Sequence, residues 1–174
     1  MRVVLVSCLM GASFALAAQA GPEDFVPGTI ITGFGDVAAV EDARLGAETE
    51  FHIAYDIAQA AAEGEVSRPL VTPARFLNMH VAAGVPEENI HLAVVVHGGA
   101  YRDLLNADSY GGANPNAPLI EQLIAQGVTI ELCGQTAAYR DVSEDDLLPG
   151  ITISLSAMTS HALLQQQGYT LNPF

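Results

Sequence analysis

The stretch VTIELCGQTAAYRD, residues 128–141, contains the pattern that decides the fold. Its apolar run is typical of a strand and ends at Cys133, after which Gly134 is expected to open a short helix. The stretch IHLAVVVHGG, residues 90–99, has the same form, because continuous apolar residues end in His97 and two glycines. Continuous apolar strands of this kind are typical of parallel sheets that helices cover on both faces.

Strands and helices are expected to alternate along most of the chain. The expected strands are residues 51–56, 90–97, 128–133, 151–156 and 169–174. The expected helices are residues 73–83, 114–126, 134–141 and 157–168. The first of these has Thr72 as its N-cap, Pro73 as its first residue and Gly84 as its stop, and residues 98–113 are interpreted as a polar loop. The order predicts an α/β fold, a three-layer α/β/α sandwich with a mainly parallel five-stranded sheet.

Residues 1–20 have the pattern of a signal peptide. Arg2 precedes an uncharged apolar run, and an A-x-A cleavage site ends at Ala20. The run is too short for a comfortable membrane span, and Cys8 comes too early in it for a lipoprotein acylation site. We therefore expect an exported protein, periplasmic or secreted, that begins at Gly21.

The rest of the chain is expected to form an N-terminal arm and one domain. Residues 21–48 are rich in Gly, Ala and acidic residues, and within this arm residues 28–33 could form a short strand. Residues 49–174 are expected to form the α/β domain, which is long enough to bury a core.

The charge of the chain narrows its possible partners. It has six basic residues, all of them Arg, against twenty acidic ones, and its net charge is −14. Such a surface repels phosphate backbones and anionic lipids, so we expect neither nucleic acid nor a membrane surface as a partner. An anionic substrate would need a local cationic contact. Arg102 is the preferred candidate because it follows His97 by five residues, whereas Arg140 is expected to point away from Cys133.

Cys133 is the one cysteine that remains if the leader is removed, which excludes an internal disulfide. In parallel α/β sheets, ligands bind beyond the carboxyl ends of the strands, and Cys133 lies at such an end. A helix N-terminus favours the thiolate, so this position suits a solvent-facing, reactive sulfur. The residue types alone leave open a second interpretation, in which Cys133 is an inert, small apolar residue.

Several residues near the same edge are candidates for assisting or binding a substrate. His97 and Gly98 end the strand before Cys133, and His97 could act as a base or a charge partner, or be a structural histidine. Gln135 could donate a hydrogen bond to a sulfur or oxygen atom. Gly134 would allow a sharp turn and leave room for an incoming group.

No cofactor or metal site is expected. The remaining histidines show no metal-ligand spacing; they are His52, His80, His91 and His161. GFGDVA, residues 33–38, fits a dinucleotide-binding pattern, but Asp36 would place a carboxylate where the pyrophosphate should lie.

Three segments of the chain resemble the DsrE/DsrF-like family, and in particular its exported branch. They are HLAVVVHGGAYRDLL, NPNAPLIEQLIAQGVTIELCGQTAAYRDV and LPGITISLSAMTSHALLQQQGYTLNPF, within a resemblance that covers residues 50–174. The resemblance implies an α/β sandwich that assembles into a homo-oligomer, a trimer or a hexamer. It also implies that Cys133 matches the cysteine that carries sulfur as a persulfide in sulfur-relay members. The implied partners are a small sulfane-sulfur donor and a thiol acceptor, and the alternative is a non-catalytic oligomeric binding or scaffold protein.

Overall fold

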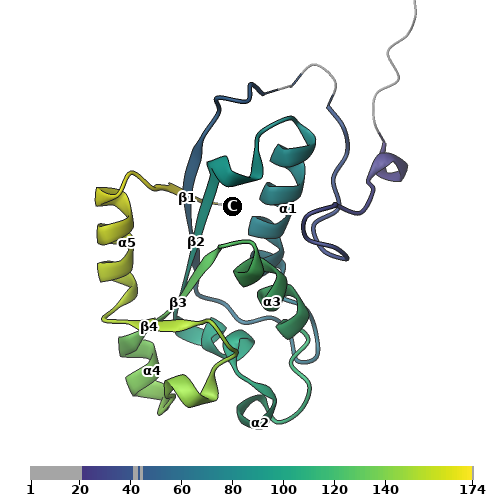
Figure 1. Cartoon of the computed structure of the whole chain (residues 1–174). Coiled ribbons are helices and arrows are strands. Elements are labelled where there is room, and N and C mark those ends of the chain that lie inside the picture. Colours follow the sequence, from purple (N-terminus) through teal and green to yellow (C-terminus); the bar gives the residue numbers. More distant parts are fainter. Residues whose placement is uncertain (1–20, 41–42, 44, 174) are drawn as a thin grey trace, which may run out of the picture.

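A computed structural model describes residues 21–40, 43 and 45–173, so the expected signal peptide lies outside the described residues. The centre is one sheet of five parallel strands in the order β4-β3-β2-β1-β5 (Figure 1). The strands are β1 (Phe51–Ile57), β2 (Ile90–Val96), β3 (Thr129–Cys133), β4 (Thr152–Ser154) and β5 (Thr170–Asn172). The α-helices are α1 (Arg68–Ala82), α2 (Ala107–Tyr110), α3 (Ala117–Ala125), α4 (Gly134–Arg140) and α5 (Ala157–Gln166). The predicted α/β fold with a parallel sheet is confirmed.

The order of the strands determines which helices cover which face. Parallel strands are joined by right-handed crossovers, so connections that step across a sheet in one direction lie on one face. The steps from β1 to β2 and from β2 to β3 share a direction, and their helices α1 and α3 contact each other. The connection from β4 to β5 returns across the sheet, and its helix α5 lies on the opposite face (Figure 1). The return of the chain therefore brings α5 over β2 and β3.

The helices on the two faces of the sheet are buried to different extents. The main core lies on the side of α1 and α3, where Val94, Val96, Ile130 and Leu132 of the sheet join the helix residues Leu70, Leu77, Leu119, Ile120 and Leu123. On the other face, Ser160 is the only buried residue of α5, and Met158 is 80 % exposed. Across the described residues, no helix combines the length and the apolar character that a membrane crossing requires.

The start of the first predicted helix is corrected by the structure. The first helix begins at Arg68 rather than at Pro73, with Ser67 as its N-cap and Pro69 in its first turn. A proline is favoured in the first turn because no N–H is needed there, and Pro69 meets that requirement before Pro73 does. The early start is fixed by a tertiary contact, in which the Ser67 N–H donates to the side chain of Asn116.

The polar loop that was predicted at residues 98–113 contains two short helices. They are the 3₁₀ helix η3 (Gly98–Leu104) and α2. Buried Asn114 holds this segment in place, because its amide donates to the carbonyl oxygens of Asp103 and Leu105. Its Oδ1 accepts from the N–H of Asn116, which ties the segment to the start of α3.

The strand expected at residues 28–33 does not form. In its place, the arm turns and packs on α1 through Asn78, which is 2 % exposed. The Asn78 Oδ1 accepts from the N–H groups of Ile30 and Ile31, and its Nδ2 donates to the carbonyl oxygens of Ile31 and Phe34. One side chain thus satisfies backbone groups that a partner strand would otherwise have to pair.

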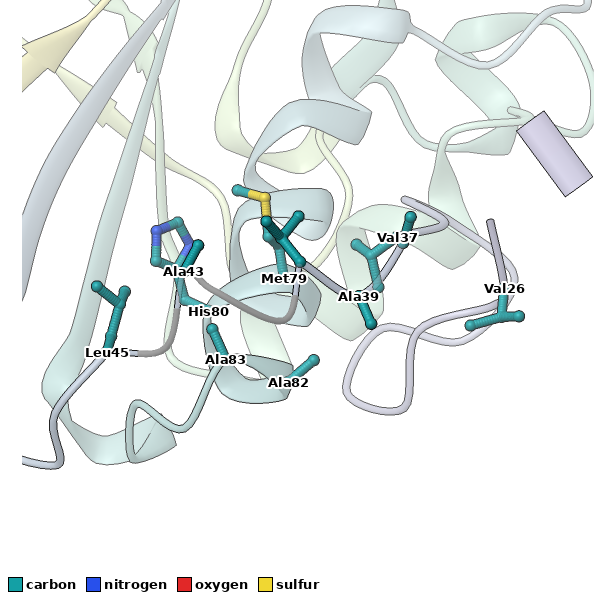
Figure 2. A pocket seen from close by; sticks show the side chains of 11 residues that line it. Val26, Val37, Ala39, Ala43, Leu45, Met79, His80, Ala82 and Ala83 are labelled. Atoms are coloured by element: carbon teal, nitrogen blue, oxygen red, sulfur yellow. The ribbon is translucent and has the colours of Figure 1, made fainter. Parts of the chain in front are cut away.

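Beside this contact, the arm and the last turns of α1 enclose an apolar hollow (Figure 2). Val26, Val37 and Leu45 line it from the arm, and Met79 and His80 line it from α1. This hollow lies on the α1 side of the sheet, whereas α5 covers the opposite face. No residue of the end of β3 lines it.

Candidate functional site

Cys133 is the last residue of β3, where it pairs with Ser154 of β4. Helix α4 begins at the next residue, as the sequence predicts. The prediction that the thiol faces solvent is wrong for the single chain, because Cys133 is only 6 % exposed. The first residue of α5, Ala157, lies close enough for its N–H to hydrogen-bond the sulfur. Placing α5 over the end of β3 is what buries the thiol.

Polar groups from two helix starts lower the pKa of the thiol at this position. Burial raises the pKa of the Cys133 thiol, but the backbone N–H groups of Ala157, Thr136 and Gln135, together with the Thr136 hydroxyl, outweigh that effect. The resulting pKa lies below the ordinary value for cysteine. These donors come from the first turns of two helices, α4 and α5, where N–H groups lack partners within the helix. The site is therefore built to stabilise a thiolate.

The residues after Cys133 connect the two helix starts. At Gly134 a Cβ atom would overlap the carbonyl oxygen of Ser154, so the glycine permits a close approach of the chain to β4. It does not leave the free space that the sequence suggested. The side-chain amide of Gln135 donates to the carbonyl oxygen of Leu155 at 3.2 Å. Only its backbone N–H points to the sulfur.

Gly98 supports the site through its backbone. Its N–H donates to the hydroxyl oxygen of Thr136 at 3.2 Å. The hydroxyl hydrogen of Thr136 is then free to be donated to Cys133. Gly98 has a φ of 56°, and a Cβ there would lie 2.9 Å from the carbonyl oxygen of Ala58, so glycine is required at this position.

His97 belongs to a second group of polar side chains at the same edge. Its Nε2 lies 3.2 Å from one carboxylate oxygen of Asp56, and the Nε2 of His161 lies 2.7 Å from the other. Burial raises the pKa of Asp56, but the hydrogen bonds to His161 and His97 outweigh it, so the pKa lies below its ordinary value. Asp56 therefore holds both imidazoles in fixed positions.

The register of the strands places this group beside the thiol. His97 follows Val96, and Val96 pairs with Leu132, the residue before Cys133. His97 and Cys133 thus occupy matching positions on neighbouring strands, which lie about 4.8 Å apart. His161 lies one helical turn after Ala157, the residue whose N–H bonds the sulfur.

Neither candidate arginine contacts Cys133. Arg102 is exposed on η3, and its side chain makes no hydrogen bond or ion pair with the residues that the structure describes. The guanidinium of Arg140 packs over the rings of Tyr101 and Tyr139, at 5.3 Å and 5.2 Å from their centres. Arg102 thus places a positive charge at this edge, but no hydrogen bond or ion pair with the described residues fixes the orientation of its side chain.

Sequence reasoning missed Asp56, Thr136, Ala157 and His161. Asp56 carries a recognisable signal, since it is a lone acid near the carboxyl end of the apolar strand FHIAYDI. The other three depend on where α4 and α5 begin relative to β3, which no short pattern encodes.

These features define a class of protein: a parallel α/β domain with a hydrogen-bonded thiol at the carboxyl edge of its sheet. The model of the DsrE/DsrF-like family matches residues 47–173. The chain belongs to this family, which is associated with sulfur relay.

Two solved structures share the fold. One is a protein of unknown function, MTH1491, from Methanobacterium thermoautotrophicum, with 20 % sequence identity and a TM-score of 0.55, covering 71 % of this chain and 98 % of its own. The other is the ychN protein from E. coli, with 19 % identity and a TM-score of 0.51, covering 70 % of this chain and 100 % of its own. The comparison with curated proteins gives no match.

The hydrogen bonds to the sulfur predict the effect of Thr136→Val. Loss of one donor should slow alkylation of Cys133 by iodoacetamide at neutral pH about 2- to 10-fold, since a hydrogen bond is worth about 0.5–1.5 kcal/mol. The pH–rate profile should move to higher pH. Thr72→Val on α1, on the other face of the sheet, is the matched control and should react like the wild type. Equal profiles for Thr136→Val and the wild type would show that the hydroxyl does not act on the thiol.

Proposed function

We propose that this protein handles sulfane sulfur and carries it as a persulfide on Cys133. The observation that carries the proposal is the place of Cys133 at the carboxyl end of β3, directly before α4, where N–H groups of two helix starts lower the pKa of the thiol. Thiolates, not thiols, attack sulfur, and these donors favour the thiolate. Membership of a family associated with sulfur relay supports the same chemistry.

The proposed transfer consists of two displacements that need no oxidant. The Cys133 thiolate attacks the sulfane sulfur of a donor R–S–S⁻, such as a polysulfide, so that a new S–S bond forms and that of the donor breaks. The remainder of the donor leaves with the bonding electron pair. A second thiolate then attacks the outer sulfur, takes it as a new persulfide and releases the Cys133 thiolate, by the logic of thiol–disulfide exchange.

Other residues at the edge would assist this chemistry. His97, held by Asp56 on the neighbouring strand, is positioned to hydrogen-bond an anionic donor or to protonate the leaving group. Arg102, exposed on η3, would supply positive charge to the incoming donor. Gly98 and Gln135 would act through their backbones, which hold Thr136 and the sulfur. The low exposure of Cys133 favours a small donor over a bulky one.

Mass spectrometry after treatment with polysulfide tests the proposal. The wild type should gain the mass of one sulfur atom on the peptide that contains Cys133, and the gain should disappear on treatment with a reductant. Cys133→Ser should abolish the adduct. The chain that begins at Gly21, in which Cys133 is the one cysteine, is the matched control and should retain it.

An unmodified Cys133 at polysulfide concentrations that modify a free thiol peptide would contradict persulfide transfer. That result would favour the non-catalytic alternative.

We also propose that the protein is exported and then acts as a periplasmic or secreted protein. The support is the leader-like pattern of residues 1–20 and the A-x-A site that ends at Ala20. N-terminal sequencing of the protein from a secreting host should give a chain that begins at Gly21. A chain that still begins at Met1 or within the next few residues, and that stays in the cytoplasm, would contradict export.

A homo-oligomeric binding or scaffold protein is the second candidate function. It is favoured by apolar side chains that the single chain leaves in solvent on α4 and at the start of α5, where Leu155 and Met158 lie close together in the sequence. They are Tyr139, Leu155 and Met158, which are 81 %, 71 % and 80 % exposed. Exposed apolar side chains that gather on one surface mark interaction sites. Assembly through this surface is compatible with the sulfur chemistry, because Leu155 and Met158 flank the Ala157 N–H.

The assembly is tested with Met158→Glu. A buried charge opposes association, so light scattering after size exclusion should show a shift from a trimer or hexamer toward the monomer. Val40→Glu, which changes an equally apolar and exposed residue on the arm, should keep the wild-type mass. A monomeric wild type, or an unchanged mass for Met158→Glu, would contradict assembly through this surface.

A further inference from the structure

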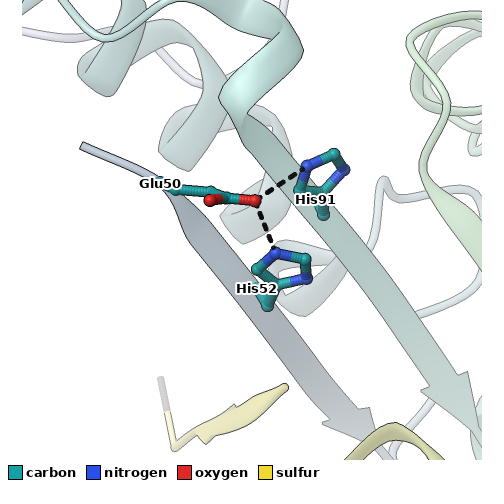
Figure 3. A group of neighbouring side chains, drawn as sticks. All are labelled: Glu50, His52 and His91. Atoms are coloured by element: carbon teal, nitrogen blue, oxygen red, sulfur yellow. Dashed lines mark hydrogen bonds and ion pairs between the residues drawn. The ribbon is translucent and has the colours of Figure 1, made fainter. Parts of the chain in front are cut away.

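Three potential metal ligands meet at the amino edge of the sheet, the edge opposite to Cys133. His52 is the second residue of β1 and His91 the second residue of β2, and the two strands pair in parallel register. That register sets the two histidines side by side, with their ring centres 4.5 Å apart. Glu50 directly precedes β1 and turns its carboxylate toward both rings (Figure 3). Thirty-eight residues separate the two histidines in the sequence, so their spacing gave no sign of this arrangement.

The ligand atoms converge on one point. The Glu50 Oε1 lies 2.9 Å from the Nε2 of His52 and 3.6 Å from the Nε2 of His91. All three atoms lie within 4.8 Å of one another. Figure 3 shows both imidazoles directing the same ring nitrogen to the same carboxylate oxygen.

The distances fit a transition-metal ion. Nitrogen and oxygen ligands lie about 2.0–2.1 Å from zinc, so two ligands of a tetrahedral site are roughly 3.4 Å apart. The distances of 2.9 Å and 3.6 Å fall on either side of that value. The carboxylate oxygen therefore lies near the ligand spacing of such a site from both imidazoles, and the two imidazole nitrogens lie within 4.8 Å of each other. The side chains are also open to solvent, since those of His52, His91 and Glu50 are 35 %, 42 % and 58 % exposed.

We infer that Glu50, His52 and His91 form a binding site for a divalent transition-metal ion of the zinc class. Two imidazoles and one carboxylate are three protein ligands, and water would complete a tetrahedral shell. Imidazole nitrogens favour zinc, copper and nickel over magnesium and calcium. Two further carboxylates strengthen the local attraction for a cation, because Glu87 and Glu88 border the hollow that His91 lines.

The site is independent of the sulfur chemistry. His52 precedes Asp56 by four residues of β1, which places it about 13 Å from the thiol edge along the strand. A thiol is the strongest competing ligand for zinc, so Cys133→Ser separates the two sites. That variant should keep the metal at the amino edge and lose only the persulfide.

Isothermal titration of the tag-free chain with Zn²⁺ tests the inference. The wild type and Cys133→Ser should each bind one ion through this site. His91→Asn should weaken binding by at least roughly tenfold, since the loss of even an indirect ligand partner costs about 10- to 100-fold. His80→Asn, which changes a histidine on α1, should bind like the wild type. Mg²⁺ should give no comparable heat.

A second pair of variants tests the site outside the strands, so that a loss of binding cannot be attributed to misfolding of His91→Asn. Glu50→Gln changes an exposed side chain outside the strand and should weaken Zn²⁺ binding while leaving the circular dichroism spectrum unchanged. Glu48→Gln, an exposed acid nearby, is its matched control and should bind normally. The inference is overturned if Glu50→Gln and His91→Asn bind Zn²⁺ as tightly as the wild type, or if Cys133→Ser abolishes the binding.

Discussion

The candidate site depends on the polar groups that the first turns of two helices, α4 and α5, bring to the sulfur of Cys133. Burial alone would favour the neutral thiol, and the N–H groups of Gln135, Thr136 and Ala157 reverse that preference. Those groups have no partners within their own helices, so an anion at this point satisfies them. The thiolate and the two helix starts therefore stabilise each other, and the close approach at Gly134 serves that arrangement.

The topology explains why two helices reach one sulfur. Helix α4 follows β3 directly, whereas α5 arrives because the chain must return from β4 to β5 across the opposite face of the sheet. The same parallel register that sets His97 beside Cys133 at the carboxyl edge sets His91 beside His52 at the amino edge. One sheet thus gathers a thiol beside two histidines at its carboxyl end, and two histidines with a carboxylate at its amino end, from segments far apart in the sequence.

Much of the fold and the position of Cys133 could be predicted from the sequence. The apolar runs at residues 90–96 and 129–133 are local signals, and the change from strand to helix at Gly134 is visible in the residues themselves. The contributions of Ala157 and His161 could not be predicted, because they depend on where α5 crosses the sheet. The burial of the thiol was missed for the same reason. The pairing of His52 with His91 requires the register of two strands, which the sequence pattern does not specify.

The folded protein is expected to hold the pKa of the Cys133 thiol below the ordinary value for cysteine, and an ultraviolet titration of the thiolate absorbance in the chain that begins at Gly21 measures this directly. The account predicts a pKa below the ordinary value for cysteine in the folded protein, and a return to that value on unfolding in urea. A folded-state pKa at or above the ordinary value would contradict it, because burial would then outweigh the donors of both helices.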